Sequence, residues 1–492
     1  MNESFVKKQV NKKQNRKEAS FLDYCASYIM PIILLVSDYI AVLLAEGTAF
    51  FLRKNVIPLY HEVFDIPDLY FYVLVPGVFL VFLYYAHTHI RRMPFWEIVQ
   101  QIFYATLYSM LVCISLMYLG GVAGVVSRLY VGMVAILAFF FICLMRYNVK
   151  RILNKLDILQ EPVIFIGAGK TAELVLRFFA NDTGFGYRVI GIIDDNPVSQ
   201  ILPQRFRILG GVAQAERLIR ASNVQNVIIT APGLERDALL GLINRIQPYV
   251  KNISFVPDLI GAPVGNIEVE RLFDEKIMLL KMKNNLVSKY NRLSKRLFDI
   301  TLSVLGLVLV VPLLFIIMVC IYMDSPGKVV FAHKRVGQQG KYFSCYKFRT
   351  MVPNAEQVLQ QYLADNPAAR EEWLDSFKLK NDPRVTRVGE FLRKTSLDEL
   401  PQIWNVIKGE MSLVGPRPIV EAEIERYGEY IHDYYLVPPG ITGMWQVNGR
   451  SDTTYPERVA MDVWYVRNWS VWIDLIYLFK TVKIVLERKG AY

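Results

Sequence analysis

Hydrophobic residues along this chain are gathered into long runs separated by polar and charged segments. Four such runs come first, spanning Tyr28–Leu52, Leu69–Ala86, Ile98–Leu119 and Leu129–Met145. Each is close to the ~20 residues that a helix needs to cross the hydrocarbon core of a bilayer. We therefore predict an α-helical bundle of four transmembrane helices within residues 21–155. Residues 1–20 are polar and basic, and they predict a disordered tail.

The charges that flank these runs predict their orientation. Lys and Arg residues precede the first run, lie between the second and third at Arg91 and Arg92, and follow the fourth. If the four runs cross in turn, these groups share one side, which should be cytoplasmic. Arg53 and Lys54 lie on the other side and weaken the bias slightly. Asp38 and Glu46 fall inside the first run, where they either line the bundle interior or mark its ends.

Residues 156–283 have a different pattern, in which short β-rich runs alternate with helical ones. The β-rich runs are 163–167, 189–194, 226–230 and 252–257. Such alternation predicts a parallel sheet covered by helices, an α/β Rossmann-like domain. Gly167 and Gly169 form a GxGxxA turn after the first of these strands, and Asp194 ends the next. This arrangement would suit a dinucleotide at a helix N-terminus, although the turn could equally be kept for packing alone.

A fifth apolar run, Leu297–Met323, opens the last region and has basic residues at both ends. They are Arg292, Lys295 and Arg296 before the run and Lys328, Lys334 and Arg335 after it. Positive charge on both flanks disfavours a crossing helix. Pro312, which follows Val311, removes a backbone hydrogen bond and forces a kink. We predict a re-entrant helix that enters the membrane and returns to the same side. The alternative is a kinked crossing helix, which would place residues 324–492 outside the cell, away from nucleotide substrates.

Composition narrows the classes of partner. The formal net charge is +11 and hydrophobic residues make up 53% of the chain. With membrane segments present, a basic surplus favours an anionic membrane surface or phosphate-bearing substrates, and we expect no nucleic acid. The five Cys residues show no CxxC spacing, so neither a zinc site nor a disulfide framework is indicated. The C-terminal segment after Trp469 could lie in the membrane interface or pack in the core.

The stretch KTSLDELPQ, residues 394–402, carries two adjacent carboxylates, Asp398 and Glu399. Taken locally, Ser396 and Glu399 could form a capping box at a helix start. A helix beginning under Asp398 would lower its pKa and keep it ionised. The surrounding basic residues favour a phosphoryl-transfer site, because guanidinium groups bind phosphate oxygens in pairs and a carboxylate can attack phosphorus. These basic residues are Lys347, Arg349, Arg393, Arg417 and Arg450.

Three segments carry a resemblance to a known family: YKFRTM (346–351), KTSLDELPQIWNVIKGEMSLVGPRP (394–418) and PGITGMWQVNGR (439–450). They resemble the bacterial polyprenyl-phosphate hexose-1-phosphate transferases, the monotopic phosphoglycosyl transferases. Among these the chain is most similar to the long undecaprenyl-phosphate galactose phosphotransferases. That layout implies a mainly α transferase domain over 284–492, containing the re-entrant helix 297–323.

The resemblance implies a reaction and roles for residues. A UDP-hexose would give its hexose-1-phosphate to undecaprenyl phosphate, releasing UMP and starting an O-antigen, capsule or exopolysaccharide repeat unit. Asp398 would be the nucleophile and a Mg²⁺ ligand, and Glu399 would complete the dyad. Arg417 and Arg450 match phosphate-contacting positions. Val311 and Pro312 match the family's helix break, although many members have Ser in place of Val311.

The resemblance also implies a multi-pass protein of the bacterial inner membrane, with its active site facing the cytoplasm, and a possible homodimer. Two alternatives stay open. Glucose could replace galactose as the transferred hexose. The Rossmann-like domain could act as a membrane-tethered nucleotide-sugar oxidoreductase or epimerase, or could sense a nucleotide without turnover.

Overall fold

The computed structural model describes residues 25–57, 66–122, 124, 126–182, 184–258, 267–272, 277–282, 285–286, 288–367, 370, 373, 379, 382–448 and 453–487. The predicted tail, residues 1–20, and the predicted phosphate contact Arg450 lie outside these residues. The chain divides into two compact units between residues 260 and 261. Each unit is described by itself.

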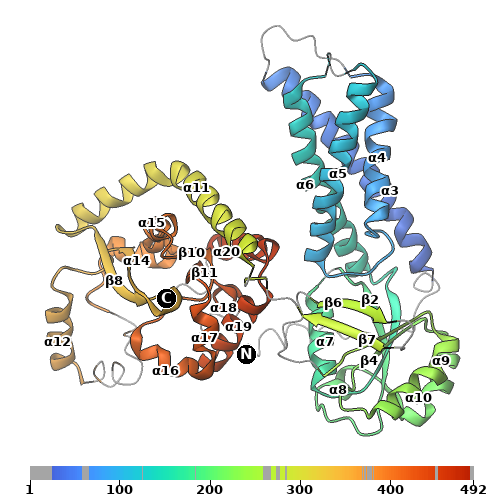
Figure 1. Ribbon diagram of the computed structural model, residues 1–492. Coiled ribbons are helices and arrows are strands. Elements are labelled where there is room, and N and C mark those ends of the chain that lie inside the picture. Colours follow the sequence, from blue (N-terminus) through green and yellow to red (C-terminus); the bar gives the residue numbers. More distant parts are fainter. Residues whose placement is uncertain are drawn as a thin grey trace. The chain divides into compact units, whose positions relative to one another are not determined.

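The first unit begins with a helical bundle (Figure 1). Its elements are α3 (Ala26–Phe51) with a π-helical turn η1 (Leu52–Val56), a second π-helical turn η2 (Tyr70–Leu74) continuing into α4 (Val75–Tyr85), α5 (Phe95–Leu119) and α6 (Arg128–Leu156). The helices α3, α5 and α6 are long and apolar enough to cross a membrane, and the segment from η2 through α4 is a shorter apolar helix. The four predicted runs are thus confirmed as helices.

The bundle interior is partly polar. Asp38 is fully buried and pairs with two residues, Arg146 and His89; the His89 Nε2–Asp38 Oδ2 distance is 2.8 Å. Glu46 is also buried and accepts a hydrogen bond from Tyr130 at 3.5 Å. Asp38 and Glu46 therefore lie in the bundle interior and do not mark the ends of the first apolar run. Burial of a charge requires such pairing, because the unpaired charge would be costly.

A five-stranded parallel sheet in the order β3-β2-β1-β4-β5 follows the bundle. Its elements are β1 (Glu161–Ile166), α7 (Lys170–Asn181), β2 (Tyr187–Ile193), α8 (Leu202–Arg205), β3 (Ile208–Gly210), η3 (Val212–Gln214), α9 (Ala215–Ser222), β4 (Asn226–Ile229), α10 (Arg236–Ile246), η4 (Gln247–Tyr249) and β5 (Asn252–Phe255). Alternate residues of β1 pack on opposite faces, one covered by α7 and α8 and the other by α9 and α10. A strand buried on both faces is continuously apolar, as β1 is. The Rossmann-like prediction is confirmed, although β3 was not foreseen.

Polar contacts join this sheet to one end of the bundle. Arg92 donates to the carbonyl of Phe185 at 2.6 Å and lies 3.1 Å from the carboxylate of Glu161. Lys150 donates to the carbonyl of Gly184 at 2.8 Å. The basic end of the bundle, which sequence predicts to be cytoplasmic, is therefore the end that contacts the sheet.

The second unit is mainly helical, as predicted. Its elements are β6 (Ile267–Leu272), β7 (Ile277–Met282), α11 (Lys289–Asp324), β8 (Val330–Val336), η6 (Gln338–Gly340), β9 (Tyr342–Phe348), α12 (Ala355–Asp365), α14 (Arg387–Thr395), η7 (Leu397–Glu399), α15 (Gln402–Lys408), β10 (Ser412–Val414), η8 (Glu421–Glu423), α16 (Ile424–Tyr427), η9 (Gly428–Tyr430), α17 (Ile431–Tyr435), β11 (Gly440–Thr442), α18 (Met444–Asn448), α19 (Tyr455–Asn468) and α20 (Val471–Glu487). The strands form two antiparallel hairpins, β6–β7 and β8–β9, and one parallel pair, β10–β11.

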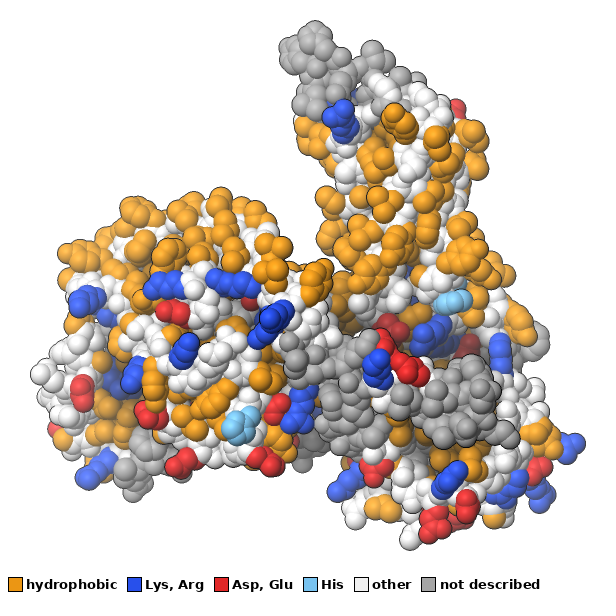
Figure 2. Space-filling model, in the orientation of Figure 1, with side chains coloured by type: hydrophobic (Ala, Val, Ile, Leu, Met, Phe, Trp, Pro, Cys, Tyr) orange, Lys and Arg blue, Asp and Glu red, His pale blue; other side chains and the backbone are white. Residues whose placement is uncertain are grey.

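The long helix α11 changes direction along its length and arches over this unit (Figure 1). Pro312 lies inside it, and a proline in a helix interior removes a hydrogen bond and bends the helix. Its middle is apolar and exposed, with Val308 at 70% and Leu309 at 81%. Figure 2 shows hydrophobic side chains gathered over α11, with Lys and Arg side chains in a band beneath them.

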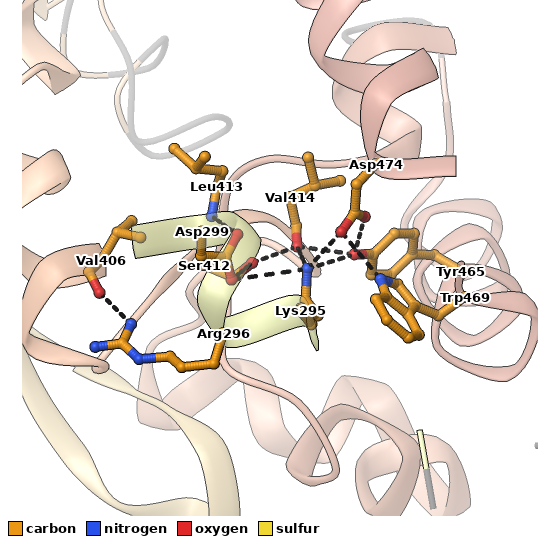
Figure 3. Close-up of polar contacts among 10 residues, drawn as sticks. All are labelled: Lys295, Arg296, Asp299, Val406, Ser412, Leu413, Val414, Tyr465, Trp469 and Asp474. Atoms are coloured by element: carbon orange, nitrogen blue, oxygen red, sulfur yellow. Dashed lines mark hydrogen bonds and ion pairs between the residues drawn. The ribbon is translucent and has the colours of Figure 1, made fainter. Parts of the chain in front are cut away.

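The first turns of α11 are tied into the unit by a buried ion pair (Figure 3). The Nζ atom of Lys295 lies 2.8 Å from Oδ2 of Asp474 on α20. It also donates to the carbonyl of Val414 at 3.1 Å and to the hydroxyl of Tyr465 at 3.2 Å. Trp469 donates its ring N–H to the same Asp474 oxygen at 3.0 Å. Lys295 is therefore a buried structural cation. It is not one of the exposed positive charges that the sequence pattern predicted beside this helix.

Two further contacts hold the same end (Figure 3). Asp299, one turn after Lys295, accepts hydrogen bonds from Ser412 Oγ at 2.8 Å and from the Leu413 amide at 3.2 Å. Arg296 donates to the carbonyl of Val406 in the last turn of α15 at 2.5 Å. A cation at a helix C-terminus satisfies free carbonyls and suits the helix dipole.

We expect Lys295→Met to destabilise the second unit by about 3–5 kcal/mol, because it leaves the Asp474 carboxylate buried without its counter-charge. The measurement is chemical denaturation of the full chain in detergent. Adding Asp474→Asn should recover much of the loss, because Asn keeps an acceptor for Tyr465 and Trp469. Lys289→Met, on an exposed turn of the same helix, is the control. Equal losses in the two single variants would contradict the role of the ion pair.

Candidate active site

The carboxylate pair lies in a turn between two helices. Ser396 ends α14 in the left-handed conformation, with φ of +56°, and its side chain makes no capping hydrogen bond. The capping box expected as the local alternative is therefore absent. Asp398 and Glu399 occupy the short helix η7, and Pro401 then begins α15.

Apolar neighbours fix this turn against the membrane helix. Leu397 and Leu400, which flank the two carboxylates, pack against a buried cluster that includes Ile317 and Ile321 of α11. The same cluster contains Phe348, whose strand β9 also carries Lys347. Since the apolar side chains of the turn are held in this cluster, the carboxylates between them are held close to β9.

Lys347 is the cation nearest to the pair. Its Nζ lies 2.5 Å from Oε1 of Glu399 and 4.0 Å from Oδ2 of Asp398. Both carboxylates keep some exposure, 16% for the Asp398 side chain and 32% for that of Glu399. The dyad is thus reachable by a substrate, and Asp398 is the member that is not already in close contact with a cation.

The electrostatic balance at Asp398 differs from the sequence expectation. The pKa of Asp398 is raised to about 6, mainly by burial; Glu399 also raises this pKa, while Lys347 and Arg393 oppose the shift. The prediction that a helix N-terminus would lower this pKa is wrong. Desolvation of the carboxylate outweighs the weak dipole of a one-turn helix.

Hydrogen bonds to other parts of the unit hold the side chains of Arg393 and Arg349. Gly389 of α14 lies against the carbonyl of Thr350, where any Cβ would overlap, so glycine lets the helix approach the end of β9. This approach allows Arg393 Nε to donate to Thr350 Oγ1 at 3.0 Å. Arg349 donates to the carbonyl of Ser325, at the far end of α11. That contact is structural, and a phosphate contact by Arg349 stays a prediction.

A second cationic group surrounds Trp445. The guanidinium of Arg417 lies 5.8 Å from its ring centroid and that of Arg458 lies 4.7 Å from it. Arg335 on β8 donates to the carbonyl of Pro418 at 3.4 Å. Burial lowers the pKa of Arg335, and the positive charge of Arg417 lowers it further. Like charges held this close suit an anionic ligand.

The two cationic groups meet at one strand. Burial raises the pKa of the Cys345 thiol on β9, while Lys347, Arg335 and Arg417 lower it and Glu399 raises it. The structure therefore brings Lys347, Arg393 and Arg417 into the neighbourhood of the dyad. The sequence analysis missed Arg335, Arg458 and Trp445. Trp445 lies within a segment that carried the family resemblance, whereas Arg335 and Arg458 have no spacing signal.

The donor set fits one kind of metal. Among the described residues, no group of three or more His, Cys, Asp and Glu side chains is placed to hold an ion. Asp398 and Glu399 supply two carboxylates, and Mg²⁺ is commonly held by one or two carboxylates together with substrate phosphates. The site thus suits Mg²⁺ that is shared with a phosphate-bearing substrate, with Asp398 as the predicted ligand.

The Rossmann-like domain uses its glycine-rich turn for internal contacts. Gly167 has a φ of +104°, and a Cβ there would lie 3.0 Å from the backbone of Thr230. Asp194 accepts hydrogen bonds from the amides of Ala168 at 2.5 Å and Asn196 at 2.7 Å. Gly169 has open space around it. These contacts are the ones expected if the glycine-rich turn serves packing within the domain. Nucleotide binding at Gly167, Gly169 and Asp194 stays a prediction.

Comparison with known proteins places the chain. Residues 290–488 match the family described as bacterial sugar transferase, and residues 84–257 match a CoA-binding domain. The UDP-galactose-lipid carrier transferase of Erwinia amylovora is 38% identical over 82% of this chain and 83% of its own length. The chain belongs to the bacterial sugar transferase family. It is therefore an enzyme, a phosphoglycosyl transferase.

Other members of the bacterial sugar transferase family have related names. The undecaprenyl-phosphate galactose phosphotransferase of Salmonella typhimurium is 41% identical over 70% of this chain and 72% of its own length. The UDP-glucose:undecaprenyl-phosphate glucose-1-phosphate transferase of Escherichia coli is 33% identical over 68% and 69%. Each of these alignments thus covers about two thirds or more of both chains.

The family resemblance implies that Asp398 is the nucleophile, a role in which it must be ionised. Because the pKa of Asp398 is raised to about 6, we expect the acid limb of kcat/KM for this transferase to lie near pH 6. Lys347→Met should move the limb to higher pH, since Lys347 lowers this pKa. Lys394→Met, whose exposed side chain pairs with Glu390, is the matched control and should leave the limb in place. A limb near the ordinary carboxyl value of ~4 would contradict the burial of Asp398.

Proposed function

We propose that this chain transfers galactose-1-phosphate from UDP-galactose to undecaprenyl phosphate, releasing UMP, through a covalent intermediate on Asp398. The observation that carries the proposal is the placement of the dyad. Asp398 is partly buried and lies 4.0 Å from the Nζ atom of Lys347, on a turn that packs directly against the apolar helix α11. The turn thereby places the proposed carboxylate nucleophile beside a cationic side chain and against an apolar helix.

In the first half-reaction, an Asp398 carboxylate oxygen attacks the phosphorus that bears the sugar. A bond from oxygen to phosphorus forms, and the bond from that phosphorus to the bridging oxygen of the diphosphate breaks. UMP leaves with the bridging oxygen and its electron pair. Lys347 and Arg393 face the developing negative charge, and such pre-positioned cations stabilise it without reorganisation.

In the second half-reaction, a phosphate oxygen of undecaprenyl phosphate attacks the same phosphorus. The bond to Asp398 breaks and the carboxylate is regenerated, so the enzyme is unchanged. Two half-reactions allow one cationic site to serve two anionic substrates in turn. Mg²⁺ bound at Asp398 with the substrate phosphates would supply neutralisation of the diphosphate oxygens. Glu399 holds Lys347 in place at 2.5 Å.

The acceptor phosphate stays at the membrane surface, and the course of α11 brings the site there. A straight helix of 36 residues would be ~54 Å long, well beyond the ~30 Å hydrocarbon core. Both ends of α11 nevertheless contact the same unit, Lys295 through Asp474 and Asp324 through the amide of Val388 at 3.0 Å. These contacts support a re-entrant helix bent at Val311 and Pro312, with the dyad on the cytoplasmic side of the inner membrane.

Galactose is chosen over glucose because relatives named for galactose are 38% and 41% identical, compared with 33% for a relative named for glucose. Transfer to a polyprenyl carrier suits the start of an O-antigen, capsule or exopolysaccharide repeat unit. Nothing in the described contacts favours oxidoreductase or epimerase chemistry in the Rossmann-like domain. That alternative, nucleotide sensing by this domain and the homodimer stay predictions.

We expect Asp398→Asn to lower UMP release from UDP-galactose by at least about 10³-fold in single-turnover assays without acceptor lipid, because the amide cannot attack phosphorus. Trapping with labelled UDP-galactose should yield a sugar-phosphate adduct on the unmodified chain. Glu390→Gln, an exposed carboxylate on the preceding helix, is the control. Normal single-turnover release by the Asn variant would disprove the covalent route.

We expect Cys residues placed at both ends of α11 to be shielded from an impermeant maleimide in intact spheroplasts. Tyr290→Cys and Lys328→Cys are suitable exposed positions in a cysteine-free background. Both should react after permeabilisation, and Lys54→Cys, on the opposite side of the bundle, should react without it. Labelling of one end of α11 from outside would show a crossing helix.

A further inference from the structure

A hollow lies at the end of the bundle that contacts the sheet. It is lined by residues of α3, of the segment that connects α4 to α5, and of α6 and β1. Its enclosed space is only about 20 Å³, and its open mouth brings the total to about 330 Å³. His89, Arg91, Arg92 and Lys150 contribute its basic lining. None of these residues has a role in the proposed transfer reaction.

The charges around the hollow leave a positive surplus. Glu161 is the one carboxylate among its described lining residues, and it lies 3.1 Å from Arg92. Lys150 is buried and donates to the carbonyl of Gly184, an uncharged acceptor. The nearby carboxylate of Asp182 accepts from two backbone amides, those of Phe95 and Gly184. Arg146, deeper in the bundle, is already matched by Asp38.

Arg91 is the exposed cation of the set. The structure gives it no ion pair or side-chain hydrogen bond among the described residues. It follows Ile90, which is 57% exposed and apolar. A cation held on an open rim beside apolar surface is available for an anionic group that approaches from the membrane.

The other wall of the hollow is apolar and belongs to the first turns of α3. Met30, Pro31 and Leu34 line it. On the same turns, Tyr28 and Ile32 are exposed on the outside of the bundle. A ligand with a phosphate and acyl chains matches both parts, since its phosphate can meet the cations while its chains lie along α3. Basic pockets between membrane helices on the cytoplasmic side are known to bind anionic headgroups.

We propose that this hollow is a binding site for the phosphate of an anionic membrane lipid. The bound phosphate lies at the mouth, near Arg91, and is attracted by Arg92 behind it. Because Arg92 and Lys150 also hold the Phe185 and Gly184 carbonyls of the sheet domain, the lipid steadies the contact between bundle and sheet. A soluble phosphate could use the same cations, and the test separates the two sources.

The test is native mass spectrometry of the full chain in detergent with added dioleoylphosphatidylglycerol or dioleoylphosphatidylcholine. We expect preferential binding of phosphatidylglycerol, weakened about fivefold by Arg91→Gln, as for loss of one cation near an anionic headgroup. Arg91→Glu should weaken it further. Arg128→Gln, an exposed arginine at the opposite end of the bundle, is the matched control and should bind as the unmodified chain does.

Equal binding of both lipids, or equal losses in the Arg91 and Arg128 variants, would overturn the proposal. Unchanged binding by both Arg91 variants would do so as well. Displacement of phosphatidylglycerol by millimolar inorganic phosphate would keep the phosphate site but overturn the lipid as its occupant. Both Arg91 variants alter an exposed side chain, and their unfolding transitions in detergent should match that of the unmodified chain.

Discussion

The attachment of α11 at both of its ends is the constraint on which the transferase unit depends. The apolar middle of this helix is left exposed by the described residues of the unit, and such a surface favours burial in lipid. Its polar ends must return to groups that can satisfy them, because unsatisfied polar groups are costly in a low-dielectric medium. The Lys295–Asp474 pair fixes one end, and the contacts of Asp324 and Ser325 fix the other. A bend between the ends then follows from geometry, and Pro312 makes the bend less costly.

The same helix sets the position of the reactive carboxylates. Ile317 and Ile321 hold Leu397 and Leu400, while Arg296 holds the end of α15. The dyad is therefore fixed from both directions to the element that lies in the membrane. Burial on this turn raises the pKa of Asp398, and Lys347 limits the rise. A carboxylate with a pKa near 6 is mostly ionised at neutral pH yet is more basic than an exposed one, a combination that suits the nucleophile role proposed for Asp398.

Much of this architecture could be predicted because its signals are local. A run of ~20 apolar residues or a β-rich pentapeptide can be identified from neighbouring positions alone, and α3, α5 and β1 were found in this way. Long-range pairs could not be predicted: Lys295 and Asp474 are 179 residues apart, and Lys295 resembled an ordinary flanking charge. Ser396 resembled a helix cap because its left-handed conformation depends on how α14 meets the turn. The pKa of Asp398 was misjudged because burial is a property of the fold.

Two of the buried ion pairs among the described residues show how charge is used beside apolar helices. Asp38–Arg146 joins α3 to α6, and Lys295–Asp474 joins α11 to α20. Such pairs contribute little net stability, because desolvation offsets most of the attraction. Their effect is to fix the orientation of each helix. An apolar helix in lipid can rotate or slide with little change in its apolar contacts, whereas a buried charge is stable only next to its partner. In α11 this orientation matters for chemistry: a rotated helix would carry Ile317 and Ile321 away from the dyad turn, and the carboxylates would lose their place beside Lys347.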